Sequence, residues 1–339
     1  MLREGGVVNT AGIVVNPASG KDIRRLVAHG SVFDNQEKVR MTRRILLGMR
    51  HAGVRRIVYM PDGYGTIPRA LNAIAEEMAG VSVEPLEMPI RNTQQDTVVA
   101  AGIMETLGVR CLTVLGGDGT SRAACKGSIA IPLLPLSTGT NNVFPYMIEA
   151  TIAGLAAGLI AADAVPVEQC CERVCLFEIL LDGRVADVAL VDAAVYDDVF
   201  MASRAVWHME KVPQLFLTRC DAASIGLSAI GGMLRHIAPS EPLGLALRLG
   251  MPASRTVHAP IAPGMVVAVG VRDVADMLPG EEHAIDVSPG LVAVDGEREV
   301  EIPRGVRAGI RLNTRGPLVV NVRRTMALAR ERGLFVQAE

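Results

Sequence analysis

Short apolar runs alternate with amphipathic stretches along the first half of the chain. The runs at 12–15, 57–60, 81–88, 112–115 and 129–136 are compact and bounded by glycine, proline or polar residues, as in strands buried on both faces. Between them, residues 38–51, 67–78 and 97–107 carry apolar side chains three or four positions apart, which predicts helices. Strands that alternate with helices predict a parallel sheet covered on both faces.

The pattern changes after Pro166. A run at 175–181, the pair Asp182-Gly183 and a second run at 185–195 are typical of a hairpin. Further strands are predicted at 265–271 and 291–302, with a turn at Asp295-Gly296-Glu297 in the second. No long helical face is evident between about 260 and 320, so a mostly β domain is expected there. Before the change, 147–162 predicts a helix of small residues; at the end, 318–322 and 325–332 predict a strand and a helix.

Composition narrows the class of protein. The 339 residues carry a net charge of −2, half of them are hydrophobic and only 3% are aromatic, so the core must be aliphatic. The absence of a basic stripe or an aromatic stacking platform argues against nucleic-acid binding. The six cysteines form no Cys-x-x-Cys pair, which argues against structural zinc. No signal-peptide pattern and no run of about 20 apolar residues is present, so we expect a cytoplasmic protein without a membrane span.

A glycine turn, Gly116-Gly117-Asp118-Gly119-Thr120, follows the apolar run at 112–115. We expect a helix over 121–126, with Thr120 or Ser121 as its N-cap. A strand, a glycine turn and a helix N-terminus together offer N–H groups and a positive dipole to a phosphate. Asp118 would repel that phosphate unless it holds Mg²⁺ or accepts a hydroxyl proton. Taken alone, the same residues also suit an ordinary tight turn.

Two other polar loops follow predicted strands. One covers 16–22 and the other covers 137–142; both are rich in hydrogen-bond donors and poor in bulky side chains. Ligands of parallel α/β sheets bind outside the carboxyl ends of the strands. Lys21 and Arg24 place positive charge beside the first loop. The three loops together therefore predict one binding site.

The three motifs, in this order, resemble the superfamily of NAD kinases and diacylglycerol- or sphingosine-type lipid kinases. Within it, the sequence from Asn16 to Arg24 looks most like the ATP–NAD kinase-like branch that includes the acetoin-catabolism protein AcoX. The resemblance implies a Rossmann-like α/β domain over 1–165, a β-rich domain over 166–317, and a chain end (318–339) that returns to the first domain. It also implies that ATP binds between the two domains.

The resemblance also assigns the site residues. Asp118 would be the catalytic or metal-linked acid. The residues expected near the nucleotide come from all three loops: Asn16, Ser19, Gly20 and Lys21; Gly116, Gly117, Gly119 and Thr120; Thr138, Gly139, Thr140, Asn141 and Asn142.

Two segments of the β-rich domain bear on the phosphoryl acceptor. Asp295-Gly296-Glu297 looks like the Asp-Gly-Glu of bacterial lipid kinases, which makes Glu297 a second candidate catalytic acid; a plain hairpin turn is the alternative. Residues 224–232 resemble a degraded form of the segment that contacts the nicotinamide nucleotide in NAD kinases. Asp221-Ala222-Ala223 stands in place of its threonine-tyrosine signature, which argues against NAD as the acceptor.

The sequence thus predicts an ATP-dependent kinase that transfers a γ-phosphoryl group to a small-molecule hydroxyl, with ATP and Mg²⁺ as cofactors and the metal ligands unassigned. Its partners would be a nucleotide and a small acceptor; assembly as a homo-oligomer stays open. Two alternatives remain: a nucleotide-binding sensor without transfer activity, and a genuine NAD kinase that makes NADP.

Overall fold

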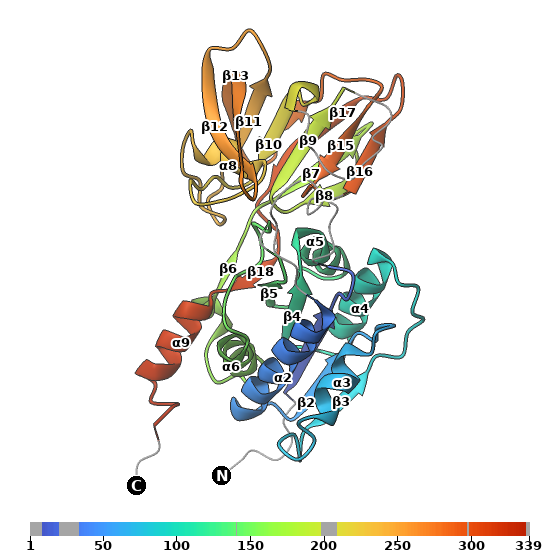
Figure 1. The fold of residues 1–339 in the computed structure, drawn as a ribbon, viewed down its shortest axis with the longest axis vertical. Helices are drawn as coiled ribbons and strands as arrows, with labels where there is room; N and C mark the ends of the chain where they lie inside the picture. Colours follow the sequence, from blue (N-terminus) through green and yellow to red (C-terminus); the bar gives the residue numbers. More distant parts are fainter. Residues whose placement is uncertain (1–8, 20–33, 140, 198–208, 297, 337–339) are drawn as a thin grey trace.

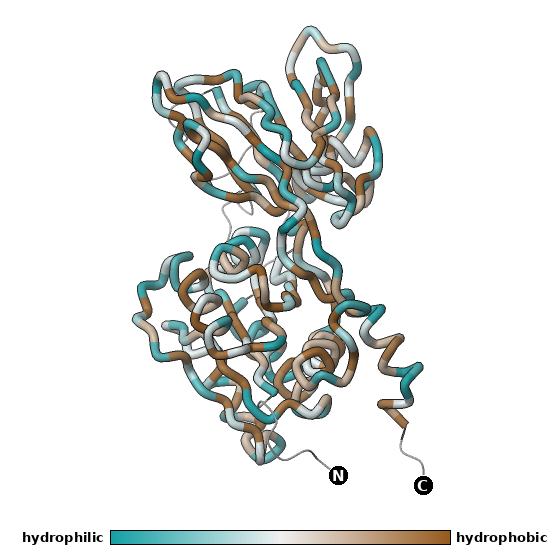
Figure 2. The backbone as a smooth tube through the Cα atoms, turned by 180° about the vertical axis from the view of Figure 1, so that it is seen from behind, coloured by the Kyte–Doolittle hydropathy of each residue, from teal (hydrophilic) through white to brown (hydrophobic). Residues whose placement is uncertain are grey.

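The chain folds into an α/β part and a β-rich part, one above the other in Figure 1. The structure is a computed structural model, and it describes residues 9–19, 34–139, 141–197, 209–296 and 298–336. Short strands near residues 171–173 and 318–320 run between the two parts. In Figure 2 hydrophobic residues recur along the strands and helices of both parts, while hydrophilic residues gather in peripheral loops.

The α/β part is built on a seven-stranded sheet, in the order β3-β2-β1-β4-β5-β18-β6. Its strands are β1 (Thr10–Val15), β2 (Arg56–Tyr59), β3 (Ser82–Pro85), β4 (Cys111–Gly116), β5 (Leu133–Ser137), β6 (Cys171–Arg173) and β18 (Leu318–Val320). Every pairing is parallel except that of β18 with β6. The predicted parallel sheet is therefore confirmed, and the strand at the end of the chain lies between β5 and β6.

Helices cover both faces of this sheet. The helices of this part are α2 (Asn35–His51), α3 (Thr66–Asn72), α4 (Gln94–Thr106), α5 (Asp118–Gly127), α6 (Ala150–Ala161), α7 (Val167–Cys170) and α9 (Val322–Glu331). Residues from α2, α3, α6 and α9 share one hydrophobic core with the sheet, while α4 and α5 contribute to the core on the other face. A side chain at Gly154 of α6 would collide with the backbone of Ile45 in α2, which explains the small-residue composition of α6.

The β-rich part contains two antiparallel sheets. The seven-stranded sheet has the order β12-β13-β11-β10-β9-β15-β16, and the four-stranded sheet has the order β14-β17-β7-β8. The first contains β9 (Asp192–Tyr196), β10 (Gln214–Leu217), β11 (Gly244–Leu249), β12 (Arg255–Ala262), β13 (Met265–Met277), β15 (Gly290–Val294) and β16 (Arg298–Ile302). The second contains β7 (Leu176–Leu181), β8 (Arg184–Ala189), β14 (Glu282–Ala284) and β17 (Ala308–Asn313). Two short helices, η1 (Met209–Lys211) and α8 (Ser228–Gly232), complete this part.

Three sequence predictions need correction. The helix predicted over 67–78 ends at Asn72, and hydrogen-bonded turns follow it. The strand predicted over 129–136 begins only at Leu133, because the Ser128 hydroxyl accepts the N–H groups of Ala130 and Ile131 and holds a turn. The single strand predicted over 185–195 is two strands, β8 and β9, which belong to different sheets.

The two predicted Asp-Gly turns are confirmed. Asp182 and Gly183 have φ values of 47° and 75°, and Asp295 and Gly296 have 50° and 69°. Two consecutive residues with positive φ are typical of the two-residue turn that joins antiparallel strands, as between the paired residues Leu181 and Arg184; Val294 pairs with Arg298, so the second connection is one residue longer. The first turn joins β7 to β8, and the second lies between β15 and β16.

Candidate active site

The three polar loops meet at one edge of the parallel sheet. They follow β1, β4 and β5, which are neighbours in the sheet, with Val15 opposite Leu115 and Gly116 opposite Ser137. Backbone bonds continue this alignment past the strand ends, because the N–H of Asn16 donates to the Leu115 carbonyl at 3.0 Å. The carboxyl ends of the three strands therefore bring together residues as far apart in the sequence as Ser19 and Thr138.

Side chains of the predicted site bond across these loops. The Asn16 amide donates to the Thr120 hydroxyl at 2.9 Å. The hydroxyls of Ser19 and Thr138 lie 2.8 Å apart, which joins the first loop to the third. A buried lysine holds the first loop by hydrogen bonds. Lys38 is fully buried, and its ammonium group donates to the backbone carbonyls of Asn16, Pro17 and Ser19 at 2.6–3.0 Å.

Lys38 was not predicted from the sequence, although a signal was present. It stands at a position of α2 whose helical neighbours Met41, Ile45 and Met49 are buried and apolar. A charged residue at such a position needs a buried partner, because an unpaired ammonium in the protein interior is costly. Here its partners are backbone carbonyls of the first polar loop.

The glycine turn continues directly into α5. The helix begins at Asp118 and its N-cap is Gly117, so the predicted cap at Thr120 or Ser121 is wrong. Gly117 has φ −103°, an ordinary value, but a Cβ there would lie 2.8 Å from the Asn142 side-chain oxygen. A Cβ at Gly116 would meet Thr120 at 2.5 Å. These glycines are thus required for close packing of the three loops, and no strained backbone is involved.

The Asp118 carboxylate holds the loop that follows β5. Its Oδ1 accepts the N–H groups of Val143 at 3.1 Å and Phe144 at 2.8 Å, and the side chain is 8% exposed. Its position at the first turn of α5 adds the favourable dipole of a helix N-terminus. The acid predicted to act in catalysis therefore also fixes the 141–146 segment.

Several other predicted residues lie in the same loops, and the rest are outside the described part. Gly119 lies in the first turn of α5, and Gly139 and Asn141 lie in the loop after β5. Gly20, Lys21, Arg24, Thr140 and Glu297 lie outside the described residues, so their predicted roles stay predictions.

The β-rich part contacts α5 through a buried ion pair. Arg122 of α5 is fully buried; its Nη1 donates to the Val294 carbonyl at 2.7 Å and lies 3.7 Å from Asp295 Oδ2. Asp295 in turn accepts the N–H groups of Leu190 and Val191 at 2.8–3.1 Å. Burial raises the pKa of Asp295, while Arg122 and the N–H groups lower it. These bonds also explain why the chain leaves one sheet for the other after β8.

A second buried arginine comes from the β-rich part. Arg219 follows β10; its guanidinium carbon lies 4.9 Å from the centre of the Phe144 ring, and its Nη2 donates to the Leu190 carbonyl at 3.2 Å. Burial lowers the pKa of Arg219, and the carboxylates of Asp118 and Asp295 raise it. The sequence analysis did not identify either buried arginine, because nothing in the local pattern shows which segments meet across the two parts.

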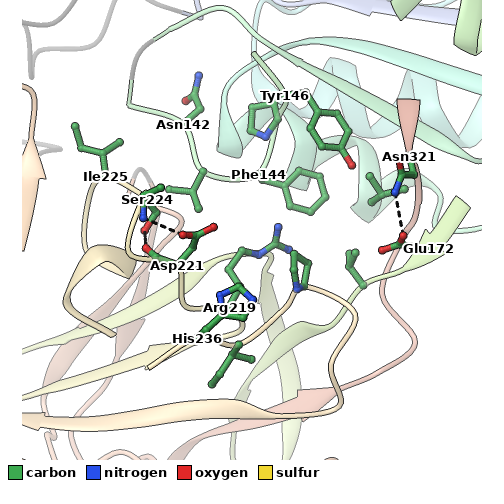
Figure 3. Close-up of a pocket in the computed structure, with 17 residues that line it drawn as sticks. Asn142, Phe144, Tyr146, Glu172, Arg219, Asp221, Ser224, Ile225, His236 and Asn321 are labelled. Atoms are coloured by element: carbon green, nitrogen blue, oxygen red, sulfur yellow. Dashed lines mark hydrogen bonds between the residues drawn. The ribbon is translucent and has the colours of Figure 1, made fainter. Parts of the chain in front are cut away.

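A cavity of about 400 Å³ opens between the two parts, beside the loop after β5. Figure 3 shows its walls: Asn142, Phe144 and Tyr146 from the loop after β5 face Arg219, Asp221 and His236 of the β-rich part. Glu172 of β6 and Asn321 close a third side, with the Asn321 amide donating to the Glu172 carboxylate at 3.1 Å. Of the predicted nucleotide loops, Asn142 contributes directly to this cavity.

The described residues were also searched for metal-binding groups and for membrane-spanning helices. No group of three His, Cys, Asp or Glu side chains there could hold a metal ion. A scan of the same residues found no helix with the length and hydrophobicity needed to cross a membrane.

Comparisons with known proteins agree with this two-part arrangement. Residues 11–164 match the family model of the ATP-NAD kinase N-terminal domain, and residues 175–315 match that of the acetoin catabolism protein X C-terminal domain. Acetoin catabolism protein X of Cupriavidus necator is 36% identical over 304 residues, which cover 87% of this chain and 85% of that protein. The chain thus has an N-terminal domain of the ATP-NAD kinase type. As a whole, the chain belongs to the acetoin catabolism protein X family.

Two solved structures were also found at low similarity. A putative diacylglycerol kinase from Bacillus anthracis is 13% identical, with a TM-score of 0.44 over 93% of this chain and 99% of that chain. A UDP-GlcNAc 2-epimerase from Neisseria meningitidis has a TM-score of 0.25 over 46% of this chain and 44% of that chain. The family assignment rests on the sequence matches alone.

Proposed function

We propose that this protein is an ATP-dependent phosphotransferase that moves the γ-phosphoryl group of ATP to the hydroxyl of a small molecule. One observation carries the proposal: the Asn142 side chain packs against the glycine turn and also lines the cavity. The Asn142 side-chain oxygen would lie only 2.8 Å from a Cβ at residue 117, and Asn142 also lines the cavity. A phosphate held on the turn would therefore lie beside a compound held in the cavity.

The loops suit a nucleotide and its metal ion. Gly116 and Gly117 have no side chains and Ser19 and Thr138 have small ones, which leaves room for phosphate oxygens beside the loops, and the positive end of the α5 dipole lies at the glycine turn. Mg²⁺ is usually held by one or two carboxylates together with substrate phosphates, which agrees with the lack of a three-ligand cluster among the described residues. Asp118 would hold Mg²⁺ in this way, and the ion would neutralise charge on the phosphates.

The protein's own groups would then position the acceptor and move one proton. As the acceptor oxygen bonds to the γ-phosphorus, the bond from that phosphorus to the bridging oxygen of ADP breaks. The hydroxyl proton would pass to Asp118, or to Glu297, which follows the Asp295-Gly296 turn. The contact between Arg122 and Asp295 supports this second candidate, because it ties that turn to the helix of the glycine motif. Such transfer depends mostly on positioning and charge neutralisation.

A nucleotide-binding sensor is the second candidate. It is favoured by the same carboxylate, because Asp118 is 8% exposed and already accepts two backbone N–H groups. In a sensor, nucleotide binding on the turn would be transmitted through Asp118 to the loop that lines the cavity, without chemistry.

A label-transfer screen separates the candidates. The full-length protein is incubated with γ-labelled ATP, Mg²⁺ and a panel of hydroxyl compounds that includes NAD, and ATP affinity is measured by calorimetry on the same samples. We expect label in an acceptor at a rate above acceptor-free ATP hydrolysis. Tight ATP binding without transfer to any acceptor would favour the sensor, whereas absence of ATP binding would contradict both candidates.

A further inference from the structure

We infer that the cavity between the two parts selects an acceptor without negative charge, a small neutral or cationic hydroxyl compound. The inference rests on the proposed function and adds the substrate class. It depends on three features of the cavity: its size, its two carboxylates, and the presence of one arginine among its described lining residues.

The size of the cavity favours a small acceptor. Its volume of about 400 Å³ lies near the lower end of the range of about 300–1,000 Å³ found for small-molecule sites. About half of the lining residues are apolar, and they come from both parts of the chain, among them Val143, Phe144, Ile225 and Ile237. These residues suit a carbon skeleton, and the polar groups among them then decide which substituents are accepted.

Two carboxylates face the cavity from different sides. Glu172 comes from β6 and Asp221 from the loop after β10, and Figure 3 shows them on opposite sides of the opening. Their hydrogen-bond partners are neutral: Asn321 donates to Glu172, and the Ala223 N–H donates to Asp221 at 2.8 Å. Among the described residues, neither carboxylate has an Arg, Lys or His nitrogen within 4.0 Å. Both charges therefore act on whatever enters the cavity.

One arginine stands in the described wall and offsets at most one of them. Arg219 is 8% exposed, its ring contact is with Phe144, and its Nη2 donates to the Leu190 carbonyl. Its Nε is buried without a hydrogen-bond partner among the described residues. Two carboxylates and one arginine therefore leave the described wall with a net negative charge.

This charge opposes phosphates and carboxylates but not alcohols or amines. A second negative charge is repelled by these carboxylates, which are exposed and partly screened by solvent, whereas a hydroxyl can donate a hydrogen bond to them. The dinucleotide NAD carries a negatively charged pyrophosphate, so the cavity is poorly suited to it.

Glycerol, serinol and glycerate test the inference, because they share a three-carbon skeleton and hydroxyl groups but are neutral, cationic and anionic. Their dissociation constants for the full-length protein, with a non-hydrolysable ATP analogue bound, are measured by saturation-transfer NMR titration at pH 8, where histidine side chains are ordinarily uncharged. We expect glycerate to bind at least about tenfold more weakly than glycerol, and serinol to bind as well as glycerol or better.

The double variant Glu172→Gln, Asp221→Asn removes both charges while keeping the shapes of the side chains. We expect glycerate to approach glycerol in affinity, and the control Glu105→Gln, an exposed residue of α4, to change nothing. Preferred binding of glycerate, no binding of any of the three, or unchanged discrimination in the double variant would overturn the inference.

Label transfer to the same three compounds distinguishes a failure of this inference from a failure of the proposed function. If glycerol and serinol bind in preference to glycerate but no compound in any panel is phosphorylated, the proposed function fails and the inference stands. If label is transferred but glycerate is the better acceptor, the inference fails and the proposed function stands.

Discussion

Arg122 and Asp295 form a fully buried ion pair that joins the helix of the glycine motif to the turn after β15. Arg122 Nη1 lies 3.7 Å from Asp295 Oδ2 and 2.7 Å from the Val294 carbonyl oxygen. The Nε and Nη2 atoms of Arg122 are buried without a hydrogen-bond partner among the described residues. If one member of the pair is removed, the other therefore keeps its charge in the interior without that partner.

Replacing Asp295 by alanine should destabilise the protein strongly. Removing one partner of a buried ion pair typically costs about 3–5 kcal/mol, because an uncompensated charge is left in the interior. The same change also removes the acceptor of the Leu190 and Val191 N–H groups. The measurement is the free energy of unfolding from urea denaturation of the full-length protein.

The exposed pair Arg235 and Asp276 provides the control. These side chains are 33% and 55% exposed, so Asp276→Ala should cost only about 0–1 kcal/mol. Equal losses for Asp295→Ala and Asp276→Ala would show that the buried pair has no special role.

Replacing Lys38 by methionine should loosen the first polar loop. The chain length is kept, but three carbonyls lose a charged donor. Because hydrogen bonds to charged groups are worth about 1.5–3 kcal/mol each, we expect a stability loss of at least about 2 kcal/mol and weaker ATP binding. Arg40→Met, at an exposed position of the same helix, is the control and should leave both unchanged. Calorimetric ATP affinity equal to wild type in Lys38→Met would show that this loop does not hold the nucleotide.

Replacing Gly117 by alanine should weaken nucleotide binding in a protein that still folds. The added Cβ would lie 2.8 Å from Asn142 Oδ1, so that side chain must move out of the position it shares with the cavity. The control is Gly102→Ala in α4, where the nearest atom is 3.7 Å from the new Cβ. Alanine favours a helix interior over glycine, so Gly102→Ala should be neutral or stabilising by up to about 1 kcal/mol. If both variants bind ATP like wild type, the glycine turn is not the phosphate site.

The cysteines should be unreactive until the protein unfolds. All six are buried and free, and burial raises the pKa of Cys171 and of Cys220 to about 12. The thiolate is the reactive form, so at pH 8 a group with a pKa near 12 is ionised in only about one molecule in ten thousand. We expect a thiol reagent such as DTNB to titrate almost no thiols in the native protein and six after denaturation. Fast reaction of native protein would contradict the burial described above.

The local parts of this fold could be predicted from the sequence because each carries its own signal. The strands ending at Val15, Gly116 and Ser137 are short apolar runs that stop at polar loops, and their adjacency follows from the general geometry of parallel sheets. The Asp295-Gly296 turn follows from the backbone preference of its two residues. The start of α5 was misplaced because both Asp118 and Thr120 are good residues for a helix N-terminus.

The contacts between the two parts could not be predicted in the same way. Arg122, Asp295 and Arg219 are far apart in the sequence and meet only through the packing of α5 against the β-rich part. Lys38 did break an apolar helical pattern, which is a signal that was available. Glu172 became part of the cavity only because β6 lies in the first sheet beside the strand at the end of the chain.

The central claim is that Asp118 takes part in phosphoryl transfer, and Asp118→Asn tests it most directly. Oδ1 accepts both loop N–H groups, and Oδ2 also accepts that of Val143 at 3.2 Å, so an asparagine can keep the two Oδ1 bonds while losing the charge. Rates of γ-label transfer from ATP to the best acceptor are compared for wild type and Asp118→Asn, with melting temperatures as a check on folding. We predict a loss of about 10²–10⁴-fold with a nearly unchanged melting temperature, as for other positioned acids and bases. A normal transfer rate in Asp118→Asn would contradict the account and leave Asp118 as a residue that only holds the 141–146 loop.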